Sequence, residues 1–307
     1  MNKPRHILSA ALCSVLVAQA APIKAEDFEL THAGDVSGKS GIGDLNDLGQ
    51  ELEARGWYVS ANCTDYCSMT IVDAPFGRSG KVLRYEYRSD QDNEPVPQQD
   101  AHNANLIWSF SPPRSELWAR YYFATDVATA ESNATLSQYF NSGTKLHYIK
   151  PVGAGPSYVT GQPYTTPHGA FSIYATQEMA VCPSGGTPAF KGGGGCSNNL
   201  SNGAVLIDDK RWYCVEYHFK LNSDYAQSDG ALEVWVDGTP VQSLMNLKMV
   251  DGHVTLADAR IGSIEVYRQH SNHMLRYEDD LVWSDTRVGC LSGDTLSPGQ
   301  PMNLQVQ

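Results

Sequence analysis

The sequence predicts an all-β protein in which antiparallel strands form a sandwich or a jelly roll, and three observations carry this prediction. Short runs of alternating apolar and polar residues recur along most of the chain after about residue 80. Clusters of Gly, Pro, Asn and Asp separate these runs. Helical periodicity is scarce; its strongest case is the short segment 44–55, with leucines at 45, 48 and 52.

The N-terminus has the pattern of a secretory signal peptide. Lys3 and Arg5 precede a run of mostly apolar or small residues from 7 to 21. This run is shorter than the roughly 20 apolar residues that span a bilayer. Small residues predict cleavage after Ala20, with cleavage after Ala25 as the alternative. The first 20 residues are therefore expected to be removed from a secreted or periplasmic protein.

The remaining chain has the length of one large β domain, expected over residues 26–290, followed by a polar tail at 291–307. The whole sequence has 22 basic and 34 acidic residues, a net charge of -12, and cleavage after Ala20 would leave 20 basic residues. Such an acidic surface disfavours nucleic acid and anionic membranes as partners. Later segments do not have the length and apolarity of a membrane span, so no membrane insertion is expected. The protein is expected to be a monomer.

The cysteines predict a disulfide-stapled domain. Apart from the cysteine of the signal segment there are six, an even number in an exported chain. Closeness in sequence favours Cys63 with Cys67 and Cys182 with Cys196, which leaves Cys214 for Cys290. A zinc site is the weaker alternative, because no second pair of cysteines or histidines has zinc spacing.

Four segments show the alternation expected of half-buried strands. In 116–123, Leu117, Ala119, Tyr121 and Phe123 form the apolar row, opposite Glu116, Trp118, Arg120 and Tyr122. The segments 81–88, 212–221 and 232–237 divide in the same way, and Asp237 with Gly238 then predicts a hairpin turn. One face of each strand is expected in the core and the other along a wet groove. Residues 91–105 and 182–203 are expected to be long surface excursions.

Seven stretches of the sequence resemble the concanavalin A-like jelly roll. They are DFEL at 27–30, SGKVLRYEY at 79–87, ELWARYYF at 116–123, KLHYIKP at 145–151, RWYCVEYHFKLN at 211–222, GALEVWVDG at 230–238 and YEDDLVWSDTRVG at 277–289. More narrowly, they resemble secreted bacterial proteins of this superfamily that are similar to polysaccharide lyases. The resemblance implies two packed antiparallel sheets, one of them concave, and a function in glycan hydrolysis, glycan elimination or glycan binding.

The hydrolase alternative is the less favoured one. Retaining glucanases of this fold carry an ExDxxE strand that places two carboxylates roughly 5 Å apart. Glu233, Trp235 and Asp237 share a strand face here, but no third carboxylate follows them. A strand that ends in a DG turn explains the same residues.

A lyase that works by β-elimination needs a cation to neutralise a uronate carboxylate and a His or Tyr to move protons. Alginate lyases of this fold carry an RTEL or RSEL strand, and RSEL stands here at 114–117. The chain lacks their QIH and YFKAG segments, for which KLHYIK is the local substitute. The resemblance therefore implies His147 as base, Tyr122 as acid, and Arg120 with Arg114 as carboxylate neutralisers.

Further residues are expected along the groove or at an ion. The substrate-binding candidates are Arg84, Arg88, Trp118, Glu216, His218 and His270, and Trp118 with Trp235 can offer aromatic platforms to sugar rings. Glu29, Asp279 and Asp280 resemble positions that hold a structural calcium in similar jelly rolls, with ordinary edge acidity as the alternative. No cofactor is expected in catalysis. A loop is favoured over a metal-binding helix for His270 and His273.

These expectations converge on a protein that acts on extracellular polysaccharide. The first choice is a polysaccharide lyase that cleaves a uronate-containing polymer by β-elimination. The alternatives are a non-catalytic, lectin-like glycan-binding protein, a glycoside hydrolase, and a structural envelope protein whose polar faces do not converge.

Overall fold

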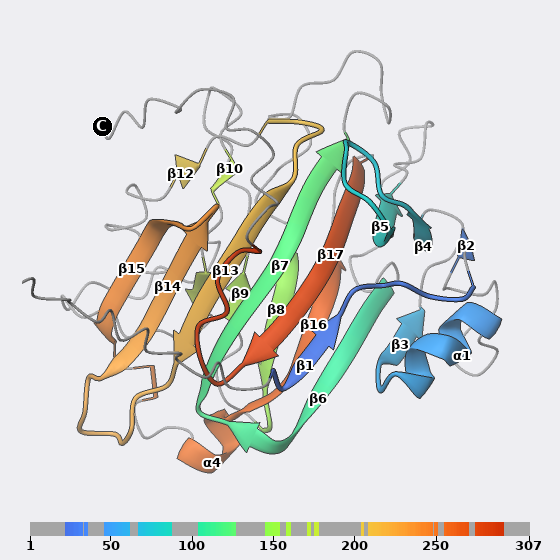
Figure 1. The fold of residues 1–307 in the computed structure, drawn as a ribbon. Helices are drawn as coiled ribbons and strands as arrows, with labels where there is room; N and C mark the ends of the chain where they lie inside the picture. Colours follow the sequence, from blue (N-terminus) through green and yellow to red (C-terminus); the bar gives the residue numbers. More distant parts are fainter. Residues whose placement is uncertain are drawn as a thin grey trace, which may run out of the picture.

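The chain folds into two large antiparallel sheets that pack face to face, as Figure 1 shows. The computed structural model describes residues 22–32, 34–35, 46–61, 67–87, 104–126, 145–153, 158–160, 171–172, 175–177, 204–205, 208–247, 249–250, 255–269 and 274–291. This architecture confirms the predicted all-β jelly roll. The signal segment, the excursion at 182–203 and nearly all of the polar tail lie outside the described residues. Most of the excursion predicted at 91–105 lies outside them as well, but Ala104 and Asn105 are the first residues of a strand.

The first sheet has nine strands. Its order is β15 (Thr239–Leu247), β14 (Gly230–Val236), β13 (Tyr213–Lys220), β7 (Glu116–Asp126), β17 (Met274–Ser284), β5 (Lys81–Tyr87), β4 (Cys67–Asp73) and β2 (Gly34–Asp35), while β1 (Lys24–Glu26) also pairs with β17. The first and last strands of the described chain are therefore neighbours.

The second sheet has six strands. Its order is β11 (Ala175–Gln177), β9 (Tyr158–Thr160), β8 (Lys145–Pro151), β16 (Ile261–Gln269), β6 (Ala104–Arg114) and β3 (Tyr58–Ala61). A separate pair is formed by β10 (Phe171–Ser172) and β12 (Ala204–Val205). The chain crosses from the six-stranded to the nine-stranded sheet at Ser115, between β6 and β7.

The two helices among the described residues are short and lie at the margins of the sandwich (Figure 1). The predicted helix is present as α1 (Asp47–Ala54); the side chain of Asn46 caps it by accepting a hydrogen bond from the Gly49 amide at 2.9 Å. Its apolar face buries Leu48 and Leu52. The second helix, α4 (Leu256–Ala259), was not expected from the sequence.

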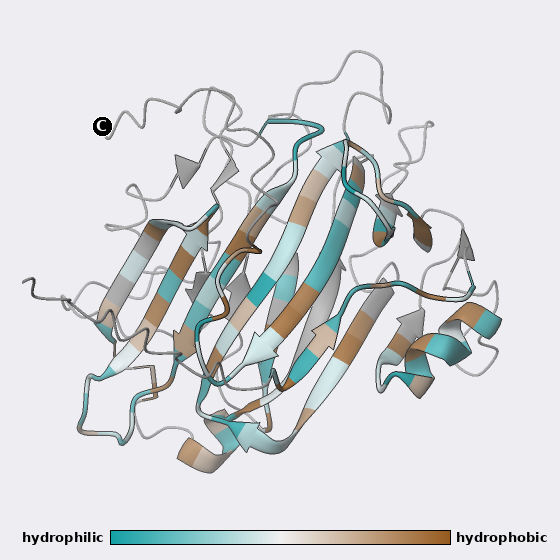
Figure 2. Cartoon of the chain, viewed as in Figure 1, coloured by the Kyte–Doolittle hydropathy of each residue, from teal (hydrophilic) through white to brown (hydrophobic). Residues whose placement is uncertain are grey.

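The apolar rows predicted from alternation do form the core between the sheets. Leu117, Ala119, Tyr121 and Phe123 of β7 belong to one buried cluster with the apolar row of β13. Brown and teal residues alternate along these strands in Figure 2. The predicted hairpin turn is also confirmed, because Asp237 and Gly238 have φ values of 49° and 75°, as a tight turn between paired strands requires.

The opposite face of the nine-stranded sheet is not the wet groove that the alternation suggested. Arg120, Tyr122 and Glu216 on this face are 4%, 2% and 1% exposed. A second buried cluster, which includes Tyr122, Trp212 and Tyr277, lies there, with Phe76 and Cys290 packed against it. Two segments cover this outer face: the loop 74–80 and the residues that follow β17.

Candidate functional site

The structure separates the four predicted catalytic residues. Arg120 and Tyr122 lie on the outer face of β7, in the nine-stranded sheet. His147 belongs to β8 of the six-stranded sheet, and Arg114 is the last residue of β6. The four residues implied to act together therefore do not lie on one sheet, as a shared active site would require. Strand alternation gives the parity of a residue within its own strand but does not say to which sheet the strand belongs.

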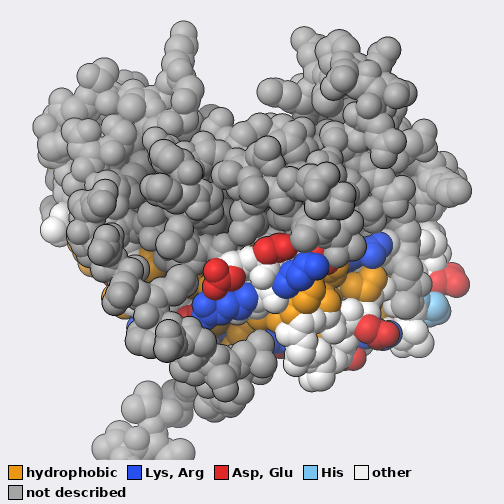
Figure 3. All heavy atoms as spheres, turned by 90° about the horizontal axis from the view of Figure 1, so that it is seen from above, with side chains coloured by type: hydrophobic (Ala, Val, Ile, Leu, Met, Phe, Trp, Pro, Cys, Tyr) orange, Lys and Arg blue, Asp and Glu red, His pale blue; other side chains and the backbone are white. Residues whose placement is uncertain are grey.

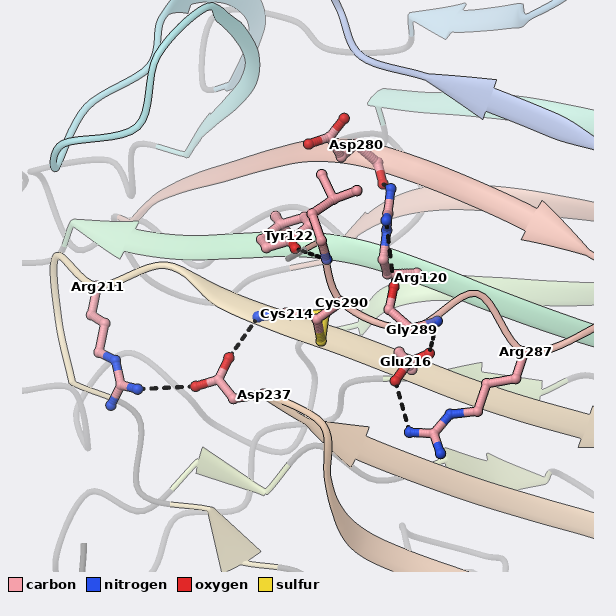
Figure 4. The surroundings of a disulfide bond; sticks show 11 residues. Arg120, Tyr122, Arg211, Cys214, Glu216, Asp237, Asp280, Arg287, Gly289 and Cys290 are labelled. Carbon is pink, nitrogen blue, oxygen red and sulfur yellow. Dashed lines mark hydrogen bonds and ion pairs between the residues drawn. A yellow bond between two sulfur atoms is a disulfide. The ribbon is translucent and has the colours of Figure 1, made fainter. Parts of the chain in front are cut away.

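A segment that we call the C-terminal strap, Asp285–Leu291, binds three of the residues predicted to bind or cleave substrate, Arg120, Tyr122 and Glu216 (Figure 4). Arg120 donates to the carbonyls of Gly289 at 3.4 Å and Asp280 at 3.3 Å. The hydroxyl of Tyr122 accepts a hydrogen bond from the Leu291 amide at 2.8 Å. These side chains hold the strap, so the structure gives them an anchoring role in place of carboxylate neutraliser and acid.

Glu216 is the second anchor of the strap. One carboxylate oxygen accepts the Gly289 amide at 2.7 Å and the other accepts Arg287 at 3.0 Å. The disulfide Cys214–Cys290 lies beside it and confirms the predicted pairing, with 5.9 Å between the Cα atoms. In Figure 1 the red segment after β17 runs across the sheet at this place. Glu216, predicted to bind substrate, is thus occupied by the chain itself.

The remaining cysteines and two site candidates cannot be placed in the same way. The pairs Cys63 with Cys67 and Cys182 with Cys196 lie outside the described side chains, as do Arg88 and His270.

Of the other candidates, Arg84 donates to Thr70 Oγ1 at 3.0 Å on the outer face of β5. Arg114 donates to Asp285 at 3.0 Å, where the strap begins.

An aromatic group occupies the outer face farther along the same strands. Trp118 stacks on His218 with 4.0 Å between ring centroids, and Trp235 lies 5.5 Å from Trp118. The guanidinium of Arg287 lies 4.4 Å from the ring of Trp235. Because the chain itself covers one face of each indole, this geometry does not favour the predicted sugar platforms.

His218 is held at both ring nitrogens by carboxylates. Nδ1 lies 2.9 Å from Glu233, and Nε2 lies 2.8 Å from Glu116. Ser243 donates to the second oxygen of Glu233 at 3.2 Å. The imidazole therefore links three strands of the sheet, β7, β13 and β14.

His147 points into the space between the sheets and is 1% exposed. Its Nε2 lies 3.1 Å from Glu278, which also pairs with Arg276 at 3.0 Å. The ring of Tyr121 lies 4.0 Å away, and burial raises the pKa of its hydroxyl well above 10. A polysaccharide cannot reach a group enclosed in this way, so the geometry does not support His147 as the base.

A cavity of about 250 Å³ lies where the first and last strands meet. Its lining residues are Asp27, Glu29, Gly77, Arg78, Ser79, Trp212, Asp279 and Asp280. The three predicted calcium ligands therefore come together here. Burial raises the pKa of Asp279 to about 6, and the Arg78 guanidinium, which pairs with Asp279 and Asp280, opposes this shift.

The donor set of this cavity suits a hard cation, but its arrangement does not fit one. Among the described residues, no three carboxylate, His or Cys side chains are grouped as metal ligands would be. Arg78 lies between the two aspartates, and Glu29 accepts the Lys81 amide at 2.7 Å. Calcium at this place stays a prediction from the resemblance.

Sequence reasoning missed three charged residues that shape these sites: Arg78, Arg276 and Glu278. Arg276 and Glu278 alternate with the apolar Leu275 and Tyr277, so alternation alone would put the two charged residues on the outer face. The register shift between Asp279 and Val282 reverses the parity of β17, which turns Arg276 and Glu278 inward. Arg78 stands in a loop between strands, where the sequence gives no parity signal. Its role became apparent only from the contact with β17.

Charges of both signs are interleaved on the surface seen in Figure 3, where described Lys and Arg side chains lie next to Asp and Glu side chains. Lys210 pairs with Asp126 at 3.4 Å, and Arg211 pairs with Asp237 at 2.9 Å and Asp208 at 3.7 Å. This described part does not form a basic field that would attract a polyanion. Within the described residues, no helix is both long and apolar enough to cross a membrane.

Comparison with known proteins finds likeness only in structure. No protein family model and no curated protein sequence matches the chain. A mutant of alginate lyase Aly36B in complex with alginate tetrasaccharide has a TM-score of 0.51 at 13% identity, over 87% of this chain and 98% of that one. At this identity the likeness shows the fold, a jelly roll with lyases among its members.

Two further solved structures are less similar. The endo-β-1,4-glucuronan lyase from the fungus Trichoderma reesei has a TM-score of 0.48 at 10% identity, with 87% and 96% of the two chains covered. The marine PL-14 alginate lyase from Aplysia kurodai has a TM-score of 0.47 at 12% identity, with 86% and 99% covered.

Proposed function

We propose that this protein is an exported polysaccharide lyase that cleaves a uronate-containing polysaccharide by β-elimination. The observation that carries the proposal is the likeness of fold, over nearly the full length of both chains, to an alginate lyase. In β-elimination a base removes the proton at C5, a cation or amide stabilises the carboxylate, and an acid protonates the leaving oxygen. The disulfide Cys214–Cys290 supports an oxidising compartment.

The geometry favours the outer face of the six-stranded sheet as the place of the reaction. The strap covers the corresponding face of the other sheet, and the space between the sheets is filled. On β8, Ile149 is buried in the core, so Lys150 lies on the opposite, outer face. The exposed ring of Tyr58 marks the same face at β3.

Cross-strand register aligns the backbone of four strands in one row across this sheet. Tyr58 pairs with Ile107, Ile107 with Glu265, and Glu265 with Tyr148. Lys150 pairs with Ser263 in the next row but one. A lysine can neutralise a uronate carboxylate as a point charge, and a tyrosine can move protons. We propose Lys150 as the carboxylate neutraliser and this row as the substrate-binding surface.

The test is absorbance near 235 nm while the purified protein meets alginate, glucuronan, heparin, chondroitin and neutral glucans, because elimination leaves an unsaturated uronate that absorbs there. The expected result is a rise with at least one uronate polymer and none with neutral glucans. A flat trace with every uronate polymer would contradict the lyase.

A second candidate, a non-catalytic glycan-binding protein, is favoured by one observation. Arg120, Tyr122 and His147, three of the residues implied to be catalytic, each have a polar group engaged within the fold. This candidate predicts a flat absorbance trace together with retarded migration of the protein in gels that contain one of the polymers. The lyase predicts retardation only together with product formation.

A further inference from the structure

We propose that the Arg78 guanidinium is a built-in cation that takes the place of a metal ion between the terminal strands. On this proposal the wild-type protein needs no calcium at the cavity, and removal of the Arg78 side chain turns the cavity into a calcium site. The inference concerns the fold alone and does not depend on the proposed lyase activity.

Arg78 is enclosed on both sides of its guanidinium group. It forms ion pairs with Asp279 through Nε and with Asp280 through Nη2, and its side chain is 9% exposed. The ring of Tyr122 lies 4.1 Å from the guanidinium carbon and the ring of Trp212 lies 5.2 Å from it. The cation is therefore held by carboxylates and aromatic faces rather than by solvent.

A strand irregularity brings both aspartates to the same cation. Successive residues of a regular strand point to opposite faces, so Asp279 and Asp280 would normally diverge. The register between β17 and β7 shifts between Asp279 and Val282, and Asp280 has a φ of 47°. This bulge turns the second carboxylate toward Arg78. A conformation that an aspartate rarely adopts is thus used to complete the ion pair.

The charge balance explains why a cation is needed there. Four carboxylates line the cavity, from Asp27, Glu29, Asp279 and Asp280, and Arg78 is the one cation among the lining residues. Asp27 and Glu29 are exposed, and Asp27 also pairs with Arg55 at 3.5 Å, so Asp279 and Asp280 are the carboxylates that depend on Arg78. Asp279 is 7% exposed as a side chain. Buried carboxylates without a counter-charge are strongly destabilising. Oxygen-only donor sets of this kind suit a hard cation such as Ca²⁺, which a guanidinium can replace in charge but not in coordination.

The experiment compares thermal unfolding of the full chain in EGTA, in CaCl₂ and in MgCl₂. For the wild type we expect the same midpoint in all three solutions. For Arg78→Ser we expect a midpoint lowered in EGTA by about 5 °C or more, since Asp279 loses its counter-charge while it stays buried. Calcium at millimolar concentration should restore most of this loss, and magnesium should restore less because it demands smaller, more regular coordination.

Arg211→Ser is the matched control. Arg211 also pairs with two aspartates, Asp208 and Asp237, and lies 4.5 Å from the ring of Tyr213, but its side chain is 34% exposed. We expect a small loss of stability that calcium does not reverse. The double variant Arg78→Ser with Asp280→Asn removes one ligand, and its response to calcium should be weaker than that of Arg78→Ser.

Three results would overturn the proposal. The first is a wild-type midpoint that falls in EGTA and recovers with calcium. The second is an Arg78→Ser variant that is destabilised but does not respond to calcium. The third is failure of Arg78→Ser to fold in every solution, because calcium is expected to rescue it.

Discussion

Charged residues on the outer sheet faces of this protein fall into two groups: some bind the backbone of the strap, and one lies on the proposed substrate surface. Arg120 and Glu216 are nearly fully buried, and each one binds the backbone of the strap. Hydrogen bonds that involve a charged group contribute about 1.5–3 kcal/mol each, and leaving such a group unpaired costs more. Lys150 lies on the other sheet, where the proposed substrate surface is. A charged residue on an outer sheet face therefore has a structural role on the nine-stranded sheet and a proposed chemical role on the six-stranded sheet.

Tyr122→Phe separates an anchor from a catalytic acid. Its hydroxyl accepts the Leu291 amide, and loss of one buried hydrogen bond should lower the free energy of unfolding by about 1 kcal/mol. At temperatures below its unfolding midpoint, the variant should retain the activity that is measured as absorbance at 235 nm. Tyr225→Phe is the control, because its exposed hydroxyl accepts the Leu256 amide at 3.1 Å and should matter less. Loss of activity in a folded Tyr122→Phe protein would contradict the anchoring role and would indicate that Tyr122 acts as the catalytic acid.

Glu51 gives a prediction for pH. Its carboxylate accepts the Thr31 amide at 2.7 Å and the His32 amide at 3.0 Å, and these bonds lower its pKa from 4.5 to about 2. Between these values the unfolded chain binds more protons than the folded one. The stabilisation by Glu51 is therefore complete above about pH 5 and is lost as the pH falls toward 2.

Glu51→Gln measures this contribution. The difference in unfolding midpoint between wild type and variant should be largest at pH 6 and should shrink steadily toward pH 3. A difference that stays constant across this range would show that the carboxylate charge is not responsible.

At the scale of elements, the strap decides which sheet face is accessible. It is joined to β13 by a disulfide that closes a loop of 76 residues, and to β7 by Tyr122 and Arg120. The local alternation of β7 and β13 does not predict that the strap covers their outer face, because the contact joins Gly289 and Glu216, which are 73 positions apart in the sequence. A contact of that range depends on the final topology. This is why the sequence predicted both rows of each strand correctly and the environment of the outer row wrongly.

Replacing Cys214 and Cys290 by Ser tests the strap as a unit. The chain-entropy estimate for a loop of this length is on the order of 4 kcal/mol, so a marked fall in the unfolding midpoint is expected. Trypsin should also cleave after Arg287 faster in the variant than in the wild type, at temperatures where both are folded. Equal cleavage rates would mean that the hydrogen bonds of Glu216 hold the strap without the disulfide.

At the scale of the whole molecule, stability comes from two sheets packed around aromatic side chains. Trp283 is fully buried and meets Trp57 at 5.3 Å and Phe110 at 6.4 Å between ring centroids. Trp283→Ala should lower the free energy of unfolding by about 3–5 kcal/mol, measured with urea. A loss below 1 kcal/mol would contradict the core described here. Trp118→Ala, on the outer face, should cost less.

The jelly roll, the helix at α1, the turn at Asp237 and one disulfide were predictable because each depends on a local pattern or on counting. The candidate site was less predictable. His147 and Tyr122 both occupy positions that alternation permits, yet they lie on different sheets. Which sheet a strand joins depends on pairing between distant segments, and one strand's sequence does not encode it.

The most direct test of the account compares two lysines on opposite outer faces. Lys150 lies on β8 in the six-stranded sheet, and Lys220 lies on β13 in the nine-stranded sheet, which the strap covers in part; both are partly buried. On the uronate polymer that gives the strongest rise at 235 nm, Lys150→Ala should lower the rate at least tenfold and Lys220→Ala should leave it within twofold, with both variants folded. Equal rates for the two variants, or loss only with Lys220→Ala, would contradict the proposed surface.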